Sequence, residues 1–305
     1  YQDTVERLTK LSGKLLFFCL EINRLEDDAL KAMMAHPLAA KYAPWVRDLR
    51  VSRKHDLSDD LERLFLDKST TGRTTWVRLY DETLAGIRAQ VDNSALTLTE
   101  ALNQLSDPKE ERRAAAAHGI AKALSEKTQL FTLITNVLAK DKAISDEWRK
   151  YPRPVSSQNL ANLVEDEVVD ALVAAAKDSF ATTAHRYYAL KARWLGKKKL
   201  NYWDRNAPLP SVPHRDVPWS EAKATVLGAY GAFSKDLAGI VQQFFDKPWI
   251  DAPARAGKAS GAFSHPTVPS AHPYILLNYL GSTRDVMTLA HELGHGVHQV
   301  LAAPQ

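Results

Sequence analysis

Three residues near the C-terminal end have the types and the spacing of a metal site. His291, Glu292 and His295 form an H-E-x-x-H motif. On an α-helix, residues four apart lie on one face with their Cβ atoms about 5–6 Å apart, so both imidazoles could bind one metal ion. Neutral imidazole is a good zinc ligand, and a catalytic zinc keeps one position open for water. The spacing therefore predicts the metal centre of a zinc peptidase.

Glu292 is the candidate for the general base of such a site. Zinc lowers the pKa of a bound water to about 7. A carboxylate beside that water can take its proton and later pass it to the leaving amine. A motif this short also arises by chance, so the prediction depends on finding a helix around it.

A helix from about residue 283 to residue 302 is predicted around the motif. Ser282 and Asp285 have the spacing of a capping box. Gly294 and Gly296 each cost about 1 kcal/mol relative to alanine inside a helix, so we expect another backbone or the substrate to approach closely there. Apolar residues recur at roughly helical spacing along one side: Val286, Leu289, Ala290, Leu293, Val297 and Leu301.

His298 lies on the same side of the predicted helix as His291. At a rise of about 1.5 Å per residue it is about 10 Å along the axis, which is too far for both to bind one ion. We expect His298 to support the site indirectly or to pack in the core, and a third ligand to come from elsewhere. The alternative for the whole motif is a buried helix whose histidines bond to core partners.

The composition is that of a globular protein with little net charge. The 305 residues are 45% hydrophobic, enough for one large core or two smaller ones. A formal charge of +4, from 40 Lys and Arg against 36 Asp and Glu, is too weak and dispersed to indicate nucleic-acid binding. Cys19 is the single cysteine, and neither a bilayer-spanning run nor a signal-peptide pattern is visible. We therefore expect a cytoplasmic protein with no nucleic-acid or membrane partner.

Helical periodicity covers most of the chain up to residue 245. Asp107 and Pro108 have the pattern of a strong helix start, so we place a domain boundary there. Residues 1–107 are then an N-terminal helical domain, and residues 108–305 the N-terminal part of a catalytic domain. The expected helices cover residues 4–35, 57–65, 75–89, 108–140, 159–195 with an interruption near Thr182, and 220–245.

Several other polar residues are expected to have structural roles only. His36 and His55 have no partner at ligand spacing, so we expect them at the surface or as helix caps. The run from Lys197 to Lys199 follows Gly196, which stands where a glycine ends a helix. We expect these lysines to be solvated.

A small sheet is predicted next to the motif helix. Residues 251–273 hold four prolines without a helical period, and an ordered stretch of this kind is usually functional. The short, almost wholly apolar run from Tyr274 to Leu280 is typical of a buried strand, and residues 261–264 could form a second strand beside it. The free edge of this sheet could hold a peptide by main-chain hydrogen bonds.

Three segments follow one another in the C-terminal third of the chain. They are Gly257-Lys-Ala-Ser-Gly-Ala-Phe-Ser264, Pro273-Tyr-Ile-Leu-Leu-Asn-Tyr-Leu280 and Thr288-Leu-Ala-His-Glu-Leu-Gly-His-Gly-Val-His298. In this order and spacing they resemble the thimet-type M3 peptidases, specifically the oligoendopeptidase F branch. The earlier segment Asn201-Tyr-Trp-Asp-Arg-Asn-Ala-Pro-Leu209 is similar to the one that precedes the family's catalytic core.

The resemblance implies a fold and an activity. The fold would be mainly α, an elongated metallopeptidase fold with a small β-sheet beside the H-E-x-x-H helix and a deep substrate cleft. The activity would be that of a zinc-dependent endopeptidase, which hydrolyses short unfolded oligopeptides with a water activated by zinc and a glutamate base.

The resemblance also assigns roles to single residues. His291 and His295 become zinc ligands, and Glu292 becomes the general base. The family more often has tyrosine where this chain has Phe263, so any role of that hydroxyl is lost. His265 and Tyr274 could equally be structural. The residues expected along the substrate or in the cleft wall are Gly261, Ala262, Phe263, His265 and Tyr274.

The third zinc ligand of the family is a glutamate on a following helix, beyond Gln305. We therefore expect the C-terminal remainder of the same protein to supply it, and this chain alone to bind zinc weakly. A non-catalytic helical peptide-binding scaffold stays open as an alternative. A di-iron bundle would need a second E-x-x-H, but His295 alone among ten histidines has a glutamate three residues before it.

Overall fold

The computed structural model describes residues 1–210 and 215–304, which form two compact units. The first unit holds Tyr1–Tyr80 and Thr128–Arg186, and the second holds Asp81–Lys127 and Tyr187–Gln305. This division by contacts does not test the domain boundary predicted near residue 108, which stays a prediction. Across the described residues, no helix is both long enough and apolar enough to cross a membrane.

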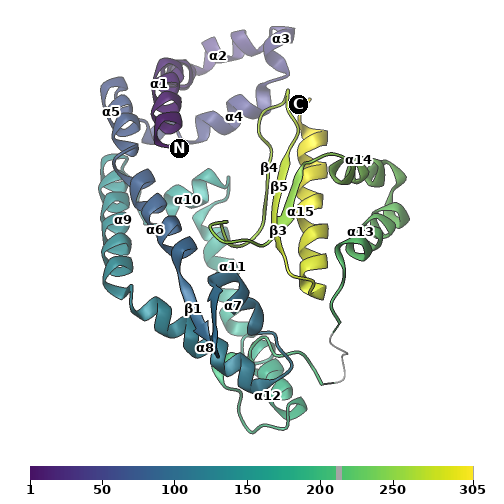
Figure 1. Cartoon of the computed structure of the whole chain (residues 1–305). Coiled ribbons are helices and arrows are strands. Elements are labelled where there is room, and N and C mark those ends of the chain that lie inside the picture. Colours follow the sequence, from purple (N-terminus) through teal and green to yellow (C-terminus); the bar gives the residue numbers. More distant parts are fainter. Residues whose placement is uncertain (211–214, 305) are drawn as a thin grey trace. The chain divides into compact units, whose positions relative to one another are not determined.

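The first unit is built from helices (Figure 1). Leu25 adopts an extended conformation with ψ of 132°, so the single helix expected over residues 4–35 is two helices. The predicted interruption near Thr182 is confirmed, because α11 ends before it. The helices are α1 (Gln2–Arg24), α2 (Asp27–Met34), α3 (Pro37–Ala40), α4 (Ala43–Val51), α5 (Asp59–Ser69), α6 (Arg73–Gly86, which continues into the second unit), α9 (Thr128–Trp148), α10 (Ser156–Ala161) and α11 (Asp166–Ser179), with the 3-10 turn η1 (Arg53–His55).

His55 and His36 have different roles in the first unit. The expected surface or capping role of His55 is wrong, because its side chain is buried, stacks on Tyr151 and bonds through Nδ1 to the Arg149 carbonyl at 2.7 Å. The capping role of His36 is confirmed, because its Nδ1 accepts a hydrogen bond from the Leu38 N–H at the start of α3.

The N-terminal part of the second unit is a β-hairpin packed on helices. Neither strand was predicted, and the helix predicted over residues 75–89 ends at Gly86, because Arg88 and Ala89 belong to the first of two antiparallel strands. Gly119 of the covering helix lies so close to the hairpin that a Cβ atom there would be 2.3 Å from the Gln90 carbonyl oxygen. The elements are β1 (Arg88–Val91), β2 (Ser94–Thr97), α7 (Leu98–Gln104), α8 (Glu110–Ser125), α12 (Ala184–Trp194) and the 3-10 turn η2 (Tyr202–Asp204).

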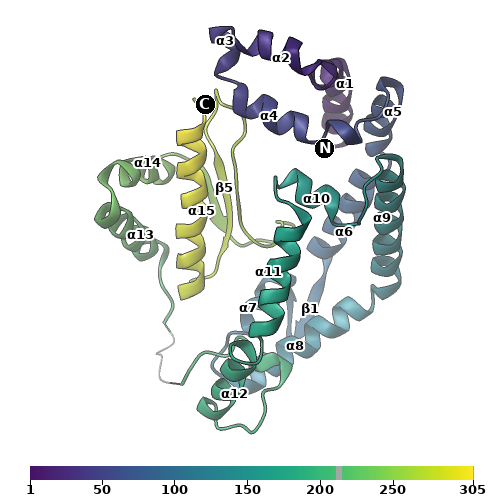
Figure 2. The same ribbon diagram turned by 180° about the vertical axis from the view of Figure 1, so that it is seen from behind.

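The C-terminal part of the second unit is a three-stranded sheet with helices beside it. Its elements are α13 (Trp219–Phe233), α14 (Lys235–Asp246), β3 (Ile250–Pro253), β4 (Phe263–His265), β5 (Tyr274–Tyr279) and α15 (Thr283–Ala302). The strand order is β3-β5-β4, with β3 parallel and β4 antiparallel to the central β5. Both views show α15 between this sheet and the α13–α14 pair (Figures 1 and 2).

The predicted fold class is confirmed: the chain is mainly helical, with a small sheet beside the motif helix. Two further predicted helices are each broken once, and the helix predicted over residues 159–195 has a second break at residues 162–165, between α10 and α11. The helix over residues 108–140 is α8 and α9, and the helix over residues 220–245 is α13 and α14, because Ser234 is extended and caps α14. The third strand, β3, was not predicted. The predicted elongation and cleft concern how the parts are arranged and stay predictions.

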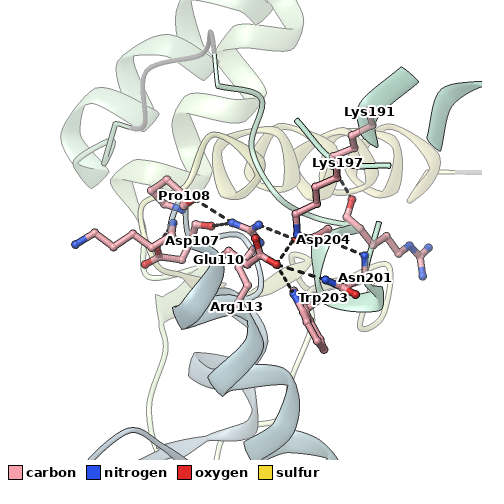
Figure 3. Close-up of polar contacts among 11 residues, drawn as sticks. Asp107, Pro108, Glu110, Arg113, Lys191, Lys197, Asn201, Trp203 and Asp204 are labelled. Carbon is pink, nitrogen blue, oxygen red and sulfur yellow. Dashed lines mark hydrogen bonds and ion pairs between the residues drawn. The ribbon is translucent and has the colours of Figure 1, made fainter. Parts of the chain in front are cut away.

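A buried carboxylate joins α8 to the segment around η2 (Figure 3). The Asp204 side chain is 0% exposed and accepts hydrogen bonds from Arg113 at 2.8 Å, from Lys197 at 2.5 Å and from the Asn201 N–H at 3.0 Å. Lys197 also bonds to Glu110 of α8. The expectation that Lys197 is solvated is therefore wrong, since its side chain is only 18% exposed. The Asn201–Leu209 segment thus has a structural role here.

The surroundings of Asp204 lower the pKa of its carboxyl group. Burial alone would raise this pKa, but the hydrogen bonds from Arg113, Lys197 and the Asn201 backbone outweigh burial. A carboxyl whose pKa is lower in the folded state stabilises that state at every pH above its unfolded pKa of about 3.9. The contribution is lost as the pH falls through the folded pKa.

We expect Asp204→Asn to lower the free energy of unfolding at pH 7 by about 3–5 kcal/mol, because it leaves Arg113 buried without its counter-charge. The variant should also lose less stability than wild type on acidification below pH 4. Denaturation followed by circular dichroism between pH 3 and pH 7 checks both effects. Asp170→Asn, at the exposed pair with Arg153, is the control and should change little. Equal losses in the two variants would contradict the expectation.

Candidate metal centre

The helix predicted over residues 283–302 is confirmed as α15, with the predicted capping box at its start. Ser282 Oγ accepts a hydrogen bond from the Asp285 N–H, and Asp285 Oδ2 accepts from the N–H groups of Ser282 and Leu280. These bonds satisfy backbone donors that a helix start otherwise leaves without partners. The motif therefore lies within a regular helix whose beginning is set by its own sequence.

Two sides of α15 have different surroundings. Leu289, Leu293 and Val297 are buried in the core that α15 shares with the sheet and with α13 and α14. His291 and His295 are on the exposed side, one turn apart. Their Nε2 atoms are 3.1 Å apart, with the ring planes at 89°. The histidines thus bond to no core partner and converge on each other.

The pair fits a zinc ion. Two imidazole nitrogens bound to one tetrahedral zinc at about 2.0–2.1 Å are about 3.3 Å apart, and the observed separation of 3.1 Å is close to this value. Within residues 1–210 and 215–304, no group of three or more His, Cys, Asp and Glu side chains is arranged to hold a metal ion. The described residues therefore offer two converging ligands, and a complete site needs a further donor.

Glu292 follows the first histidine directly but has a different environment. Its side chain is 7% exposed, whereas both neighbouring imidazoles of the motif are exposed. A carboxylate screened from bulk water interacts more strongly with a nearby proton donor. His298 is also exposed, so the possibility that it packs in the core is wrong.

Both glycines of the motif segment lie against aromatic side chains, so the expected approach of another backbone is wrong, whereas the expected approach of a substrate stays a prediction. A Cβ atom on Gly296 would be 2.7 Å from Cζ of Phe244, a fully buried ring of α14. A Cβ atom on Gly294 would be 3.2 Å from the Tyr230 hydroxyl. That hydroxyl donates to the Ala290 carbonyl at 2.8 Å, and burial raises its pKa. The glycines therefore let α13 and α14 approach the turn that carries His291 and His295.

The residues predicted to contact a substrate gather in β4, β5 and the loop before β4. His265 of β4 is directly opposite Tyr274 of β5. Phe263 lies two residues before His265, on the same sheet face, and the three side chains are exposed. This face is opposite to the one packed on α15. Their contact with a substrate stays a prediction, as does that of Gly261 and Ala262.

The loop before β4 is held at two places. Lys258 donates to the carbonyl oxygens of Asp251 and Pro253 in β3, both at 2.9 Å. Asn278 of β5 donates to the carbonyl oxygens of Ala259 and Gly261, also at 2.9 Å. The sequence analysis missed both anchors, because neither has a regular spacing to the motif.

A further contact joins β4 to α15. Gln299 and Ser264 exchange two hydrogen bonds, one of them through the main chain of the strand. The spacing of Gln299, four residues after His295, could have indicated this residue because it repeats the interval between the two histidines. Its partner Ser264 could not be predicted from spacing.

Two family models match the chain. The model described as Oligopeptidase F matches residues 21–88, and the model described as Peptidase family M3 matches residues 234–305. Residues 21–88 and 234–305 are therefore similar to peptidase family M3. The M3 match covers the sheet and the whole of α15.

Relatives of the chain are named oligopeptidases. The chain is 25% identical to oligopeptidase PepF of Bacillus subtilis over 298 residues, which cover 95% of the chain and 44% of the relative. It is 24% identical to an oligoendopeptidase F homolog of Borreliella burgdorferi over 303 residues, which cover 98% of the chain and 51% of the relative. The chain therefore spans about half the length of the curated relatives it matches.

The fold of the chain is similar to that of solved peptidase structures. PZ peptidase A with inhibitor 2 matches with a TM-score of 0.79 at 17% identity, over 97% of this chain and 52% of that chain. Oligoendopeptidase F from Enterococcus faecium matches with a TM-score of 0.61 at 18% identity, over 79% of this chain and 48% of that chain. The predicted resemblance to the oligoendopeptidase F branch is confirmed.

We expect Gly296→Ala to lower the free energy of unfolding by about 1–3 kcal/mol, because its methyl group would overlap the Phe244 ring, which has no room to move. Gly239→Ala in α14 is the matched control. Its Cβ would meet nothing within 4 Å, so alanine should add up to about 1 kcal/mol through helix propensity. Urea denaturation followed by circular dichroism compares the two, and equal stabilities would contradict the packing argument.

Proposed function

We propose that this chain carries the zinc-binding and proton-transfer half of an endopeptidase that hydrolyses short unfolded oligopeptides. The observation that carries the proposal is the pair of Nε2 atoms 3.1 Å apart on the exposed side of α15, directly beside the largely buried Glu292. The match to the model of peptidase family M3 and the names of the relatives support the same reaction class.

His291 and His295 would hold the zinc ion through Nε2. When bound, zinc supplies a Lewis acid that polarises the scissile carbonyl and lowers the pKa of water to about 7. Glu292 accepts a proton from the attacking water and passes it to the leaving amine. The described residues offer two converging ligands. By resemblance to the M3 peptidases, a glutamate from the C-terminal remainder of the same protein would complete the set.

The edge strand of the sheet supports the proposed preference for short unfolded peptides. β4 is an edge strand, since the strand order is β3-β5-β4. An extended peptide can pair with such an edge through main-chain hydrogen bonds, whereas a folded protein rarely presents a free extended segment. Gly261 and Ala262 would lie along this peptide, and the exposed side chains of Phe263, His265 and Tyr274 would contact its flanking residues.

We also propose a cellular compartment for the protein. The single cysteine, Cys19, is a free thiol that is partly exposed. A chain that uses cysteine in this way suits a reducing compartment, and we infer the cytoplasm.

We expect the purified chain to bind one zinc ion weakly, since two imidazoles leave the ligand set incomplete. His291→Ala and His295→Ala should weaken binding by more than the roughly 10–100-fold that loss of an outer partner costs. Isothermal titration with zinc measures the affinity. His185→Ala, at an exposed histidine of α12 outside the motif, is the control and should bind as wild type does. If all three variants bind equally well, His291 and His295 are not the ligands.

We expect Glu292→Gln to reduce turnover by about 10²–10⁴-fold, because the amide cannot accept the proton. The assay is cleavage of a quenched oligopeptide by this chain together with the polypeptide that supplies the third ligand. Zinc content by mass spectrometry should be unchanged in the variant. Peptide binding that survives chelation, with no turnover by wild type, would instead identify a non-catalytic scaffold.

A further inference from the structure

We propose that Gln299 and Ser264 form a clamp that positions the edge strand β4 against the metal helix and sets the register of a bound peptide. The inference rests on the proposed function of the same site. Ser264 Oγ donates a hydrogen bond to Gln299 Oε1 at 2.8 Å, and Gln299 Nε2 donates to the Ser264 carbonyl oxygen at 3.3 Å. Both side chains are half-buried. One helix residue thus holds a side chain and a main-chain group of the strand.

The clamp lies on the same stripe of α15 as the metal ligands. His291, His295 and Gln299 are spaced by four residues, so they follow one another along one face of the helix. Each step advances about 6 Å along the axis at 1.5 Å per residue. The helix therefore fixes the separation between the imidazole pair and the point where β4 is attached.

The hydrogen-bond pattern of the sheet determines which groups of β4 face its free edge. The Ile275 N–H donates to the Trp249 carbonyl at 2.8 Å, toward β3. In an antiparallel pair the hydrogen-bonded and non-hydrogen-bonded positions alternate, so Ile275 and its partner Ser264 form a non-hydrogen-bonded pair. The N–H and C=O groups of Ser264 then point away from β5, toward the free edge.

Gln299 therefore donates to the Ser264 carbonyl oxygen, which would otherwise accept a hydrogen bond from a peptide at the free edge. The next residue whose main chain would face the same edge is Pro266, and proline has no N–H to donate. A peptide strand can pair with the Ser264 N–H and with groups before it, but not with the edge beyond it. The clamp and Pro266 therefore limit the part of the β4 edge that can pair with a peptide. This limit restricts how far a bound peptide can shift along β4 relative to His291 and His295.

Hydrogen exchange of the purified chain tests the contact. In Gln299→Met, which loses both hydrogen bonds, amides of residues 262–268 should exchange about tenfold faster. Ser264→Ala keeps the hydrogen bond to its main-chain carbonyl, so its amides should exchange faster than in wild type but slower than in Gln299→Met. The double variant should add little to Gln299→Met. Gln242→Met, which removes an exposed contact within α14, is the matched control and should leave exchange unchanged. Unchanged exchange in the clamp variants would overturn the proposal.

Cleavage by the assembled peptidase tests the register. In Gln299→Met, KM for an oligopeptide should rise and the cleavage positions, read by mass spectrometry of the products, should spread to neighbouring bonds. Gln299→Glu can still accept from Ser264 Oγ but cannot donate to the Ser264 carbonyl, so it should spread the positions as Gln299→Met does. Zinc content should stay at the wild-type level.

The outcomes separate the clamp from the activity. Faster exchange with wild-type cleavage positions would overturn the positioning role and leave the contact structural. Absence of turnover by the wild-type assembly would overturn the proposed function and, with it, the proposed role of the clamp in setting the peptide register. Amide hydrogen exchange would still show whether the contact between Gln299 and Ser264 stabilises β4.

Discussion

The close approach of the Phe244 ring to Gly296, which has no side chain, determines where α15 lies. A side chain at position 296 would overlap this ring, and the ring itself is fully buried, so α14 and α15 meet at one separation. Ile275 of the central strand borders the same point. Helix, sheet and the α13–α14 pair thus share one core, and the exposed stripe of α15 takes its position from that core.

One side of α15 packs in the core and the other carries the histidine pair. Residues of each side recur every four positions along the helix. Leu289 and Leu293 repeat this interval on the buried side, whereas His291 and His295 repeat it on the exposed side. Burial of the leucines stabilises the helix by about 1.5–3 kcal/mol per side chain. Helix propensity alone would not supply this, since the segment contains two glycines. The core therefore supports a helix whose exposed side is free to carry chemistry.

Local patterns predicted the parts of this chain that local interactions determine. The capping box at Ser282, the extent of α15 and the strand beginning at Tyr274 could all be read from neighbouring residues. The environment of Lys197 could not, because its partner Glu110 is 87 residues away in the sequence. The burial of His55 likewise depends on a carbonyl 94 residues away. For the same reason spacing predicted the histidine pair, but neither the aromatic rings behind the motif nor the partner of Gln299.

In the proposed peptidase, the scissile bond of a peptide has to lie at a defined distance from the metal ion. α15 can set this distance, because it carries both the histidine pair and Gln299. The imidazole pair and Gln299 belong to the same rigid stripe, so any displacement of α15 moves both together. The strand is tied to the stripe by Ser264, and the preceding loop is tied back to the sheet by Lys258 and Asn278. A loop held at two places loses less conformational entropy when a peptide binds than a free loop would. Preorganisation of the strand beside the metal ligands thus follows from contacts that themselves take no part in bond cleavage.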